Sequence, residues 1–129
     1  MPETTRLESL ETSLGVLFRD RALLKEALTH RSYLNEHPHW SPRHNERLEY
    51  LGDAVLELAV SDSLYRTLPE ASEGELTAVR AALVNFQSLA RLAGAIGLGP
   101  YIRMSKGEAR DQGRAREVIL ANAMEAVVG

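Results

Sequence analysis

Apolar residues recur at helical spacing along almost the whole chain. Leu7, Leu10 and Leu14 follow the i, i+3, i+7 pattern of an amphipathic helix. A second apolar stripe covers residues 23–28, with Asp20 in front of it as a candidate N-cap. No segment of useful length alternates with the two-residue period of a strand. The pattern therefore predicts an all-α fold whose amphipathic helices face a core.

A long helix is predicted between Asn45, a candidate N-cap, and about Leu68, where Pro69 ends it. Residues 37–43, in front of it, contain two prolines and are predicted to form a loop. Gly52 lies inside the helix, where glycine costs about 1 kcal/mol relative to alanine. We therefore expect another helix or chain to approach closely at this glycine.

The chain continues with a helix that starts at Ser72, because Glu75 stands three residues later and completes a capping box. Its apolar stripe is Leu76, Val79 and Leu83. A short helix follows at residues 86–96 and ends at a glycine-rich segment.

The last part of the chain is predicted to be a loop followed by a helix. Residues 106–114 are polar, contain two glycines and are expected to form a mobile loop. A final helix begins near Ala115 and is still apolar and helical at Gly129. We expect one domain over residues 1–129, cut from a longer protein.

Carboxylates gather on one face of the long helix. Glu46, Glu49 and Asp53 stand at i, i+3, i+7 and fall within a sector of about 60°. Like charges at this spacing repel each other by a few tenths of a kcal/mol per pair, roughly, which a divalent cation would offset. Hard oxygen ligands favour Mg²⁺ or Mn²⁺ over zinc. The opposite side of the helix is apolar and carries Leu48, Leu51 and Val55.

The final helix carries a second oxygen-bearing face, because Asn122 and Glu125 stand three residues apart. If the two helices cross, Glu49, Asp53, Asn122 and Glu125 converge around a metal ion. Spacing alone also fits an exposed acidic stripe, and both alternatives remain open at this point.

Composition narrows the function classes. The chain has 129 residues, a formal charge of −3 and no cysteine. The absence of cysteine excludes disulfides and thiolate metal sites, and it fits a reducing cytoplasm. No apolar run approaches the roughly 20 residues that span a bilayer, so no membrane association is expected. The acidic balance argues against a simple cationic nucleic-acid binder but not against one that meets phosphate through metal ions.

The acidic segment E-R-L-E-Y-L-G-D-A-V-L (residues 46–56) resembles the signature of the endonuclease domain of bacterial-type ribonuclease III, and the motifs around it stand in the same order as in that domain. The flanking matches are A-L-T-H-R-S-Y (27–33), E-G-E-L-T-A-V-R-A-A-L-V (73–84), G-L-G-P-Y-I-R-M-S-K-G-E (97–108) and I-L-A-N-A-M-E-A (119–126). The resemblance covers most of the chain, from about Leu14 to the end.

The resemblance implies a homodimeric helical bundle that cleaves double-stranded RNA with Mg²⁺, with Mn²⁺ as a substitute. Glu49 and Asp53 resemble the two catalytic acids of the signature, and Glu125 resembles the metal-binding glutamate of the last helix. Glu46 and Glu73 match supporting acidic positions. The family usually has aspartate where this chain has Asn122, which keeps an oxygen ligand but removes a charge. The family also implies a C-terminal double-stranded-RNA-binding domain, which we expect to be absent from residues 1–129.

The expected reaction is phosphodiester hydrolysis during RNA processing, including that of ribosomal RNA. It should leave 5′-phosphate and 3′-hydroxyl ends with short 3′ overhangs. Metal ligands would be Glu49, Asp53, Asn122 and Glu125, with Asp53 also positioning or deprotonating water. Tyr50 is a candidate dimer contact, and a core tyrosine is the alternative.

Five basic residues near the end of the chain are candidate RNA contacts, although a solvated loop would carry the same charges. They are Arg103, Lys106, Arg110, Arg114 and Arg116. The competing hypothesis is a dimeric RNA-binding or scaffold protein that kept the fold and lost the chemistry. Asn122 supports that alternative, whereas Glu49, Asp53 and Glu125 oppose it.

Overall fold

The computed structural model describes residues 2–40 and 43–129. Within these residues the chain forms helices and one isolated parallel bridge between Thr29 and Arg103, with no strand. The helices are α1 (Glu3–Leu14), α2 (Arg21–Ala27), α3 (Arg31–Glu36), α4 (Glu46–Thr67), α5 (Glu73–Leu83), α6 (Phe86–Ala95), the 3₁₀ turn η1 (Gly99–Tyr101), α7 (Lys106–Arg110) and α8 (Arg114–Val128). The prediction of an all-α fold is confirmed.

The predicted helix starts are confirmed where a side chain satisfies an otherwise unpaired backbone N–H group. Asp20 accepts a hydrogen bond from the Ala22 N–H at 3.0 Å and starts α2. Ser72 accepts one from the Glu75 N–H at 3.1 Å and starts α5. Pro69 lies just beyond the end of α4, as expected.

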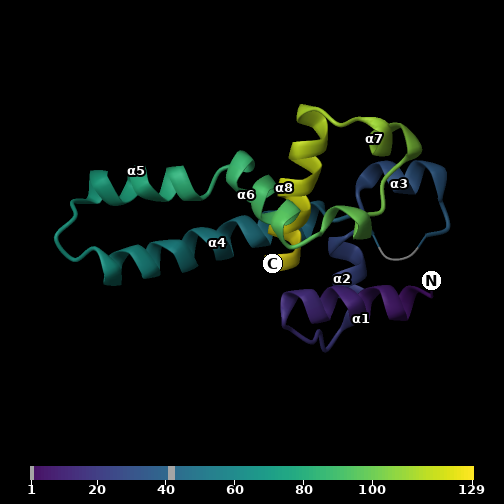
Figure 1. Cartoon of the computed structure of the whole chain (residues 1–129), viewed down its shortest axis with the longest axis horizontal. Helices are drawn as coiled ribbons and strands as arrows, with labels where there is room; N and C mark the ends of the chain where they lie inside the picture. The colour runs from purple at the N-terminus through teal and green to yellow at the C-terminus, as the bar shows by residue number, and fades with distance from the viewer. Residues whose placement is uncertain (1, 41–42) are drawn as a thin grey trace.

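The molecule consists of a helical body and a projecting hairpin (Figure 1). Helix α8 stands in the middle of the body, where it packs against α6 and the first half of α4. The rest of α4 extends away from the body and returns through α5 as an antiparallel pair. Helices α1 and α2 lie on one side of α8, and α3 and α7 lie together at the far end of the body.

The core lies in the body and is built from α1, α2, α6, α8 and the segment around η1. Its fully buried side chains include Leu10, Leu24 and Leu98, and Ala93, Ala121 and Ala123 let the helix backbones approach. Burial of such side chains contributes about 1.5–3 kcal/mol for each large one. The body, and above all α8, is therefore the stable frame on which the rest is mounted.

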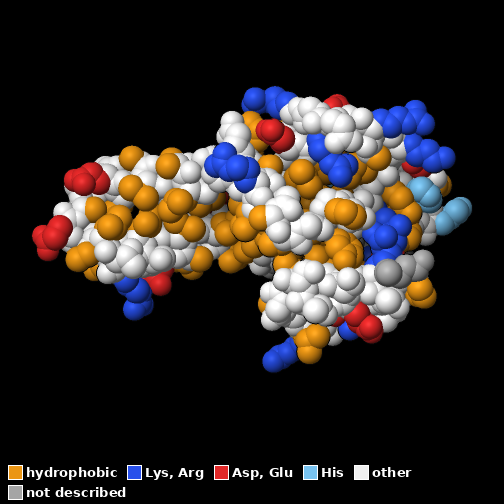
Figure 2. Space-filling view, viewed as in Figure 1, with side chains coloured by type: hydrophobic (Ala, Val, Ile, Leu, Met, Phe, Trp, Pro, Cys, Tyr) orange, Lys and Arg blue, Asp and Glu red, His pale blue; other side chains and the backbone are white. Residues whose placement is uncertain are grey.

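The projecting hairpin leaves apolar side chains exposed, contrary to the expectation that all amphipathic helices face a core. Gly52 is the one buried residue that α4 contributes among those described, and α5 contributes none. Leu58 is 72% exposed, and Leu51, Val55 and Leu83 are exposed as well. Apolar side chains are visible along both helices of the hairpin in Figure 2. In the single chain these apolar side chains stay exposed to solvent.

Residues 106–114 were predicted to be a loop, and that prediction is wrong for residues 106–110, which form α7. Ser105 accepts a hydrogen bond from the Glu108 N–H at 3.2 Å. The Lys106 N–H donates to the carboxylate of Glu36 on α3 at 3.2 Å. A five-residue polar helix has no apolar period, so only its capping residue and its tertiary contact define it.

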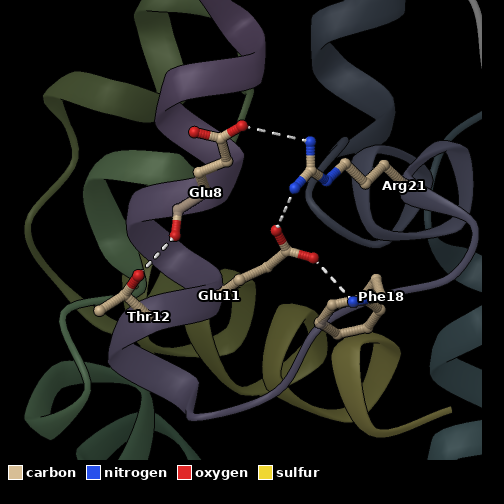
Figure 3. A network of polar contacts seen from close by, with 5 residues as sticks. All are labelled: Glu8, Glu11, Thr12, Phe18 and Arg21. Carbon is tan, nitrogen blue, oxygen red and sulfur yellow. Dashed lines mark hydrogen bonds and ion pairs between the residues drawn. The ribbon is translucent and has the colours of Figure 1, made fainter.

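A buried carboxylate joins α1 to α2 (Figure 3). Glu11 is 2% exposed, accepts a hydrogen bond from the Phe18 N–H at 2.7 Å and pairs with Arg21 at 2.9 Å. These two donors lower the pKa of Glu11, the Phe18 N–H most of all, against the opposing effect of burial. Arg21 also lies 3.6 Å from Glu8.

No helix in residues 2–40 and 43–129 is both long enough and apolar enough to cross a membrane.

Candidate active site

The acidic face of α4 and the polar face of α8 meet at one pocket, as the sequence predicted for crossing helices. The pocket has a volume of about 540 Å³. It is lined by Glu46, Glu49, Tyr50 and Asp53 from α4 and by Asn122 and Glu125 from α8. Glu49 and Asp53 thus face a second set of polar side chains, which favours the predicted convergence over a purely solvated acidic stripe.

Gly52 is the reason that the two helices come close enough. A Cβ atom at this position would lie 1.6 Å from the carbonyl oxygen of Glu125 and 2.5 Å from its carbonyl carbon. It would also lie 3.1 Å from the Gly129 nitrogen. The backbones of α4 and α8 thus touch where Gly52 meets Glu125. Gly52 directly precedes Asp53 in α4, so this contact places Asp53 next to Glu125. The expected close approach at Gly52 is confirmed.

Burial and mutual repulsion perturb the carboxylates of the pocket. The pKa of Glu125 is raised to about 7 by burial, by a hydrogen bond with Asp53, and by the charges of Asp53 and Glu49. Burial also raises the pKa of Glu49, as do the charges of Glu46 and Asp53. Near neutral pH Glu125 is therefore partly protonated, as expected where carboxylates stand close together.

The pKa of Glu46 is lowered rather than raised, because this carboxylate has a cationic partner. Arg31 on α3 donates to the Glu46 carboxylate at 3.1 Å and lowers its pKa. The sequence pattern did not identify Arg31 as the partner of Glu46, because two residues that are fifteen positions apart give no periodic signal. Arg31 appeared in the sequence matches only as part of the quoted A-L-T-H-R-S-Y segment.

The donor atoms of the pocket fit a hard divalent cation in their chemistry. Besides Glu46, the pocket holds three carboxylates and one amide, which supply oxygen ligands of the kind that Mg²⁺ and Mn²⁺ prefer. The raised pKa of Glu125 measures an electrostatic cost that a cation would relieve. Across residues 2–40 and 43–129, no three His, Cys, Asp or Glu side chains already stand as a tight ligand cluster. The oxygens are thus grouped in one pocket without being drawn together.

Glu73 does not lie at this pocket, contrary to its predicted supporting role within the chain. It is exposed at the first turn of α5, near the far end of the hairpin, and lines a separate cavity of about 240 Å³ between α4 and α5. The other residues of that cavity include Ser61, Tyr65 and Arg80. The motif match identified Glu73 as an acidic position of the family, but it gave no information on the distance between Glu73 and the acidic pocket.

Tyr50 is 83% exposed, so the alternative of a core tyrosine is excluded. Its ring lies between the acidic pocket and a neighbouring pocket of about 730 Å³. Leu48 and Leu51 contribute apolar lining to that second pocket.

Two of the five basic candidates are held by contacts inside the body. Arg103 pairs with Glu3, and its guanidinium lies 5.5 Å from the centre of the Trp40 ring. Arg116 is half-buried and donates to the Met104 sulfur at 3.1 Å. These contacts leave little freedom to reach a phosphate.

The other three basic candidates are exposed. They are Lys106, Arg110 and Arg114, on α7 and at the start of α8. Arg114 also stacks on the ring of Phe86, with 4.6 Å between guanidinium carbon and ring centre. The surface around α7 is therefore the basic region that an anionic ligand can reach.

The fold and the pocket define an all-helical domain with a carboxylate site at the crossing of two helices. A sequence model of the Ribonuclease-III-like family matches residues 20–129. The chain is 50% identical over 124 residues to Ribonuclease 3 of a Nitratiruptor species, covering 96% of this chain and 52% of that protein. It is 52% identical over 123 residues to Ribonuclease 3 of Carboxydothermus hydrogenoformans, covering 95% and 52%.

Solved structures agree with the sequence matches. The nuclease domain of ribonuclease III from Campylobacter jejuni superposes with a TM-score of 0.83 at 43% identity, covering 94% of this chain and 80% of that one. That structure is described as flexible in the region involved in dimer formation. Dicer from Pichia stipitis superposes with a TM-score of 0.62 at 26% identity, covering 87% of this chain and 46% of that one.

The chain belongs to the ribonuclease III family. It spans about half the length of the curated relatives that it matches.

Proposed function

We propose that this chain is the catalytic part of an endoribonuclease that cleaves double-stranded RNA with Mg²⁺. One observation carries the proposal: Asp53 and Glu125, from helices far apart in sequence, meet in one pocket of a chain that belongs to the ribonuclease III family. The products would be 5′-phosphate and 3′-hydroxyl ends with short 3′ overhangs. We place this RNA-processing activity in the cytoplasm, because a chain without cysteine fits a reducing compartment.

Glu49, Asp53, Asn122 and Glu125 would hold the metal. When bound, Mg²⁺, or Mn²⁺ in its place, would lower the pKa of water and neutralise charge at the phosphate and the leaving oxygen. The protein's own part is to group and orient the carboxylates, whose ionisation the bound metal would favour. Asp53 would position the attacking water and accept its proton. The proton that Glu125 holds near neutral pH would have to leave before Glu125 could bind the metal.

Glu46 would serve the site indirectly. Its ion pair with Arg31 holds a negative charge at the rim of the pocket, where it raises the pKa of Glu49. We therefore propose a supporting role for Glu46 rather than a ligand role.

Double-stranded RNA would be held through its phosphates and 2′-hydroxyls, because the base edges of A-form RNA lie in a groove that side chains do not read. The exposed Lys106, Arg110 and Arg114 are the groups of this chain best suited to that contact. Binding through so few charges should be weak and should fall steeply with salt.

A homodimer is the second part of the proposal. The hairpin exposes a continuous set of apolar side chains, and Tyr50 stands exposed beside a pocket with apolar lining. A second copy would cover these faces by two-fold symmetry, so that two sites could cut the two strands. Sedimentation at micromolar concentration should give the dimer mass, and Tyr50→Ala should raise the dimer dissociation constant. A wild-type chain that sediments as a monomer would contradict this part.

Incubation with long duplex RNA and Mg²⁺ tests the activity, with EDTA as the control. We expect short fragments that EDTA abolishes, and loss of cleavage in Glu125→Gln without a change in melting or dimer mass. Glu117→Gln is the matched control, since Glu117 is an exposed glutamate on the same helix α8. Cleavage by Glu125→Gln at the wild-type rate would refute the site assignment.

The competing function, an RNA-binding scaffold without chemistry, rests on Asn122, which supplies no charge to the pocket. The same assay separates the two. Binding of duplex RNA without cleavage, unchanged by Asn122→Asp, would favour the scaffold.

A further inference from the structure

We propose that Asn45 is a positioning residue of the active site, because it clamps the first turn of α4 to the end of α2 and so sets where Glu49 stands. The inference rests on the proposed function, since positioning matters only if the pocket binds metal and cleaves RNA. Asn45 does not line the pocket and would touch neither metal nor RNA.

Asn45 is buried and hydrogen-bonded through three of its polar groups. Its side chain Nδ2 donates to the Ala27 carbonyl at 3.0 Å, and its backbone N–H donates to the Thr29 carbonyl at 2.9 Å. Its own carbonyl accepts from the Glu49 N–H at 2.8 Å. One residue that is 3% exposed therefore connects the body directly to the backbone of Glu49.

This arrangement differs from ordinary helix capping. A capping asparagine has an extended backbone and accepts an N–H of the first turn, as Asn85 does for the Ser88 N–H at 2.9 Å. Asn45 has φ −90° and ψ 3°, and its side chain makes no such bond. The amide donates away from the helix instead, so its function is to attach α4 rather than to stabilise the helix end.

The segment that receives Asn45 is itself fixed from the other side. Thr29 is fully buried and bridges Arg103: the Arg103 N–H donates to the Leu28 carbonyl at 2.7 Å, and the His30 N–H donates to the Arg103 carbonyl at 2.8 Å. The Thr29 hydroxyl also accepts from the Trp40 indole at 3.2 Å. The clamp thus has a rigid base.

Helix α4 packs along α8, and its first turn is also held by buried Asn45 and by the exposed Arg31–Glu46 ion pair. Gly52 fixes it against α8, and Asn45 fixes it two turns earlier; the second half of the helix projects from the body. Glu49 lies between these two attachments. Without the Asn45 attachment, the first turn of α4 can shift about the contact at Gly52. Glu49 then moves relative to Asp53, while Asp53 and Glu125 stay together.

Two substitutions separate positioning from capping. Aspartate equals asparagine as an N-cap but has no N–H to donate to Ala27. We expect Asn45→Ala and Asn45→Asp each to raise the dissociation constant for Mn²⁺, measured from the free-ion electron spin resonance signal, by about tenfold. Both should lower kcat on duplex RNA by about tenfold or more, because misplacement by about 1 Å can cost a hundredfold. KM should stay unchanged.

The aspartate variant is the sharper one, since its added charge by itself would attract a cation. Weaker Mn²⁺ binding in Asn45→Asp therefore reports lost geometry and not lost charge. Should Asn45→Asp be unfolded at the assay temperature by circular dichroism, Asn45→Ser takes its place. Serine caps equally well, and its side chain is one bond too short to reach Ala27 in the same way.

Asn85→Ala is the control for stability, because it removes a true cap from α6 without touching α4. It should lower the melting temperature and leave Mn²⁺ affinity and kcat unchanged. Asn45→Asp with wild-type Mn²⁺ affinity and kcat, or Asn85→Ala with the same losses, would overturn the positioning role. A wild-type chain that neither binds Mn²⁺ nor cleaves would overturn the proposed function, and this inference with it.

Discussion

Substitution of Gly52 by alanine tests the helix crossing on which the site depends. The added Cβ would meet the Glu125 carbonyl oxygen at 1.6 Å, whereas Cβ contacts under 3.0 Å are essentially never found. The helices α4 and α8 must therefore separate by at least about 1.4 Å, the difference between the two distances. Both atoms belong to helix backbones, so no flexible side chain can yield.

The magnitude follows from opposing effects. Overpacking in a well-packed region costs about 1–3 kcal/mol and occasionally more, and two rigid backbones place Gly52→Ala at the upper end or beyond. Alanine in a helix returns about 1 kcal/mol relative to glycine. We expect a net loss of about 2–3 kcal/mol, which for a domain of this size lowers the melting temperature by roughly 8–12 °C.

The control is Gly94→Ala, at an exposed glycine inside α6, a helix that also packs against α8. A Cβ at Gly94 meets nothing within 4 Å. The same change in residue type should therefore leave the melting temperature unchanged or raise it by a few degrees. Thermal unfolding by circular dichroism, at one fixed protein concentration because a dimer melts in a concentration-dependent way, compares the variants.

Cleavage provides the second readout for Gly52→Ala. Glu125 is the residue that is pushed away, so the variant should lose cleavage at temperatures where it is still folded, while Gly94→Ala keeps it. If Gly52→Ala melts within 2 °C, roughly, of Gly94→Ala and cleaves normally, the close approach of α4 and α8 is not what holds the site together.

Three further results are expected. Folding lowers the pKa of Glu11, so this carboxylate stabilises the fold above its unfolded pKa, near 4.5, and the contribution is lost as pH falls through the folded pKa. Between about pH 5 and 3 the melting temperature of the wild type should therefore fall more than that of Glu11→Gln. Parallel curves for the two proteins would contradict this. Leu10→Ala should cost about 2–5 kcal/mol in urea unfolding, because Leu10 is fully buried. Leu17→Ala, at a side chain that is 81% exposed, should stay within about 0.5 kcal/mol, and equal losses at both sites would contradict the assigned core. Asn122→Asp should lower the Mg²⁺ concentration for half-maximal cleavage by about tenfold, because ligand charge sets affinity; an unchanged requirement would exclude residue 122 from the metal site.

Local chemistry made much of the fold predictable. Asp20 and Ser72 start helices because their side-chain oxygens satisfy backbone N–H groups within three residues, and Pro69 ends one because it cannot continue the pattern. Gly52 signalled a close contact because glycine is otherwise unfavourable inside a helix. These effects act over a few neighbouring residues, so they can be predicted from the sequence alone.

Other features depended on partners distant in sequence. Asn45 was expected to cap α4, and the same residue type at the same position donates instead to Ala27, because the end of α2 is folded against it. Glu73 shares a motif with the site residues but lies near the far end of the hairpin. The apolar stripes of α4 and α5 look like core faces in the sequence, yet the body packs on neither.

The sequence by itself determined the longer helices and the alignment of Glu46, Glu49 and Asp53 on one face, since helical periodicity is a property of the backbone. Only the tertiary structure decided that this face meets Asn122 and Glu125, because the meeting depends on how α4 lies against α8. That placement comes from a backbone contact at Gly52 and from the packing of α8 in the core. Residues that meet across more than 70 positions of sequence show no periodic pattern from which the contact could be predicted.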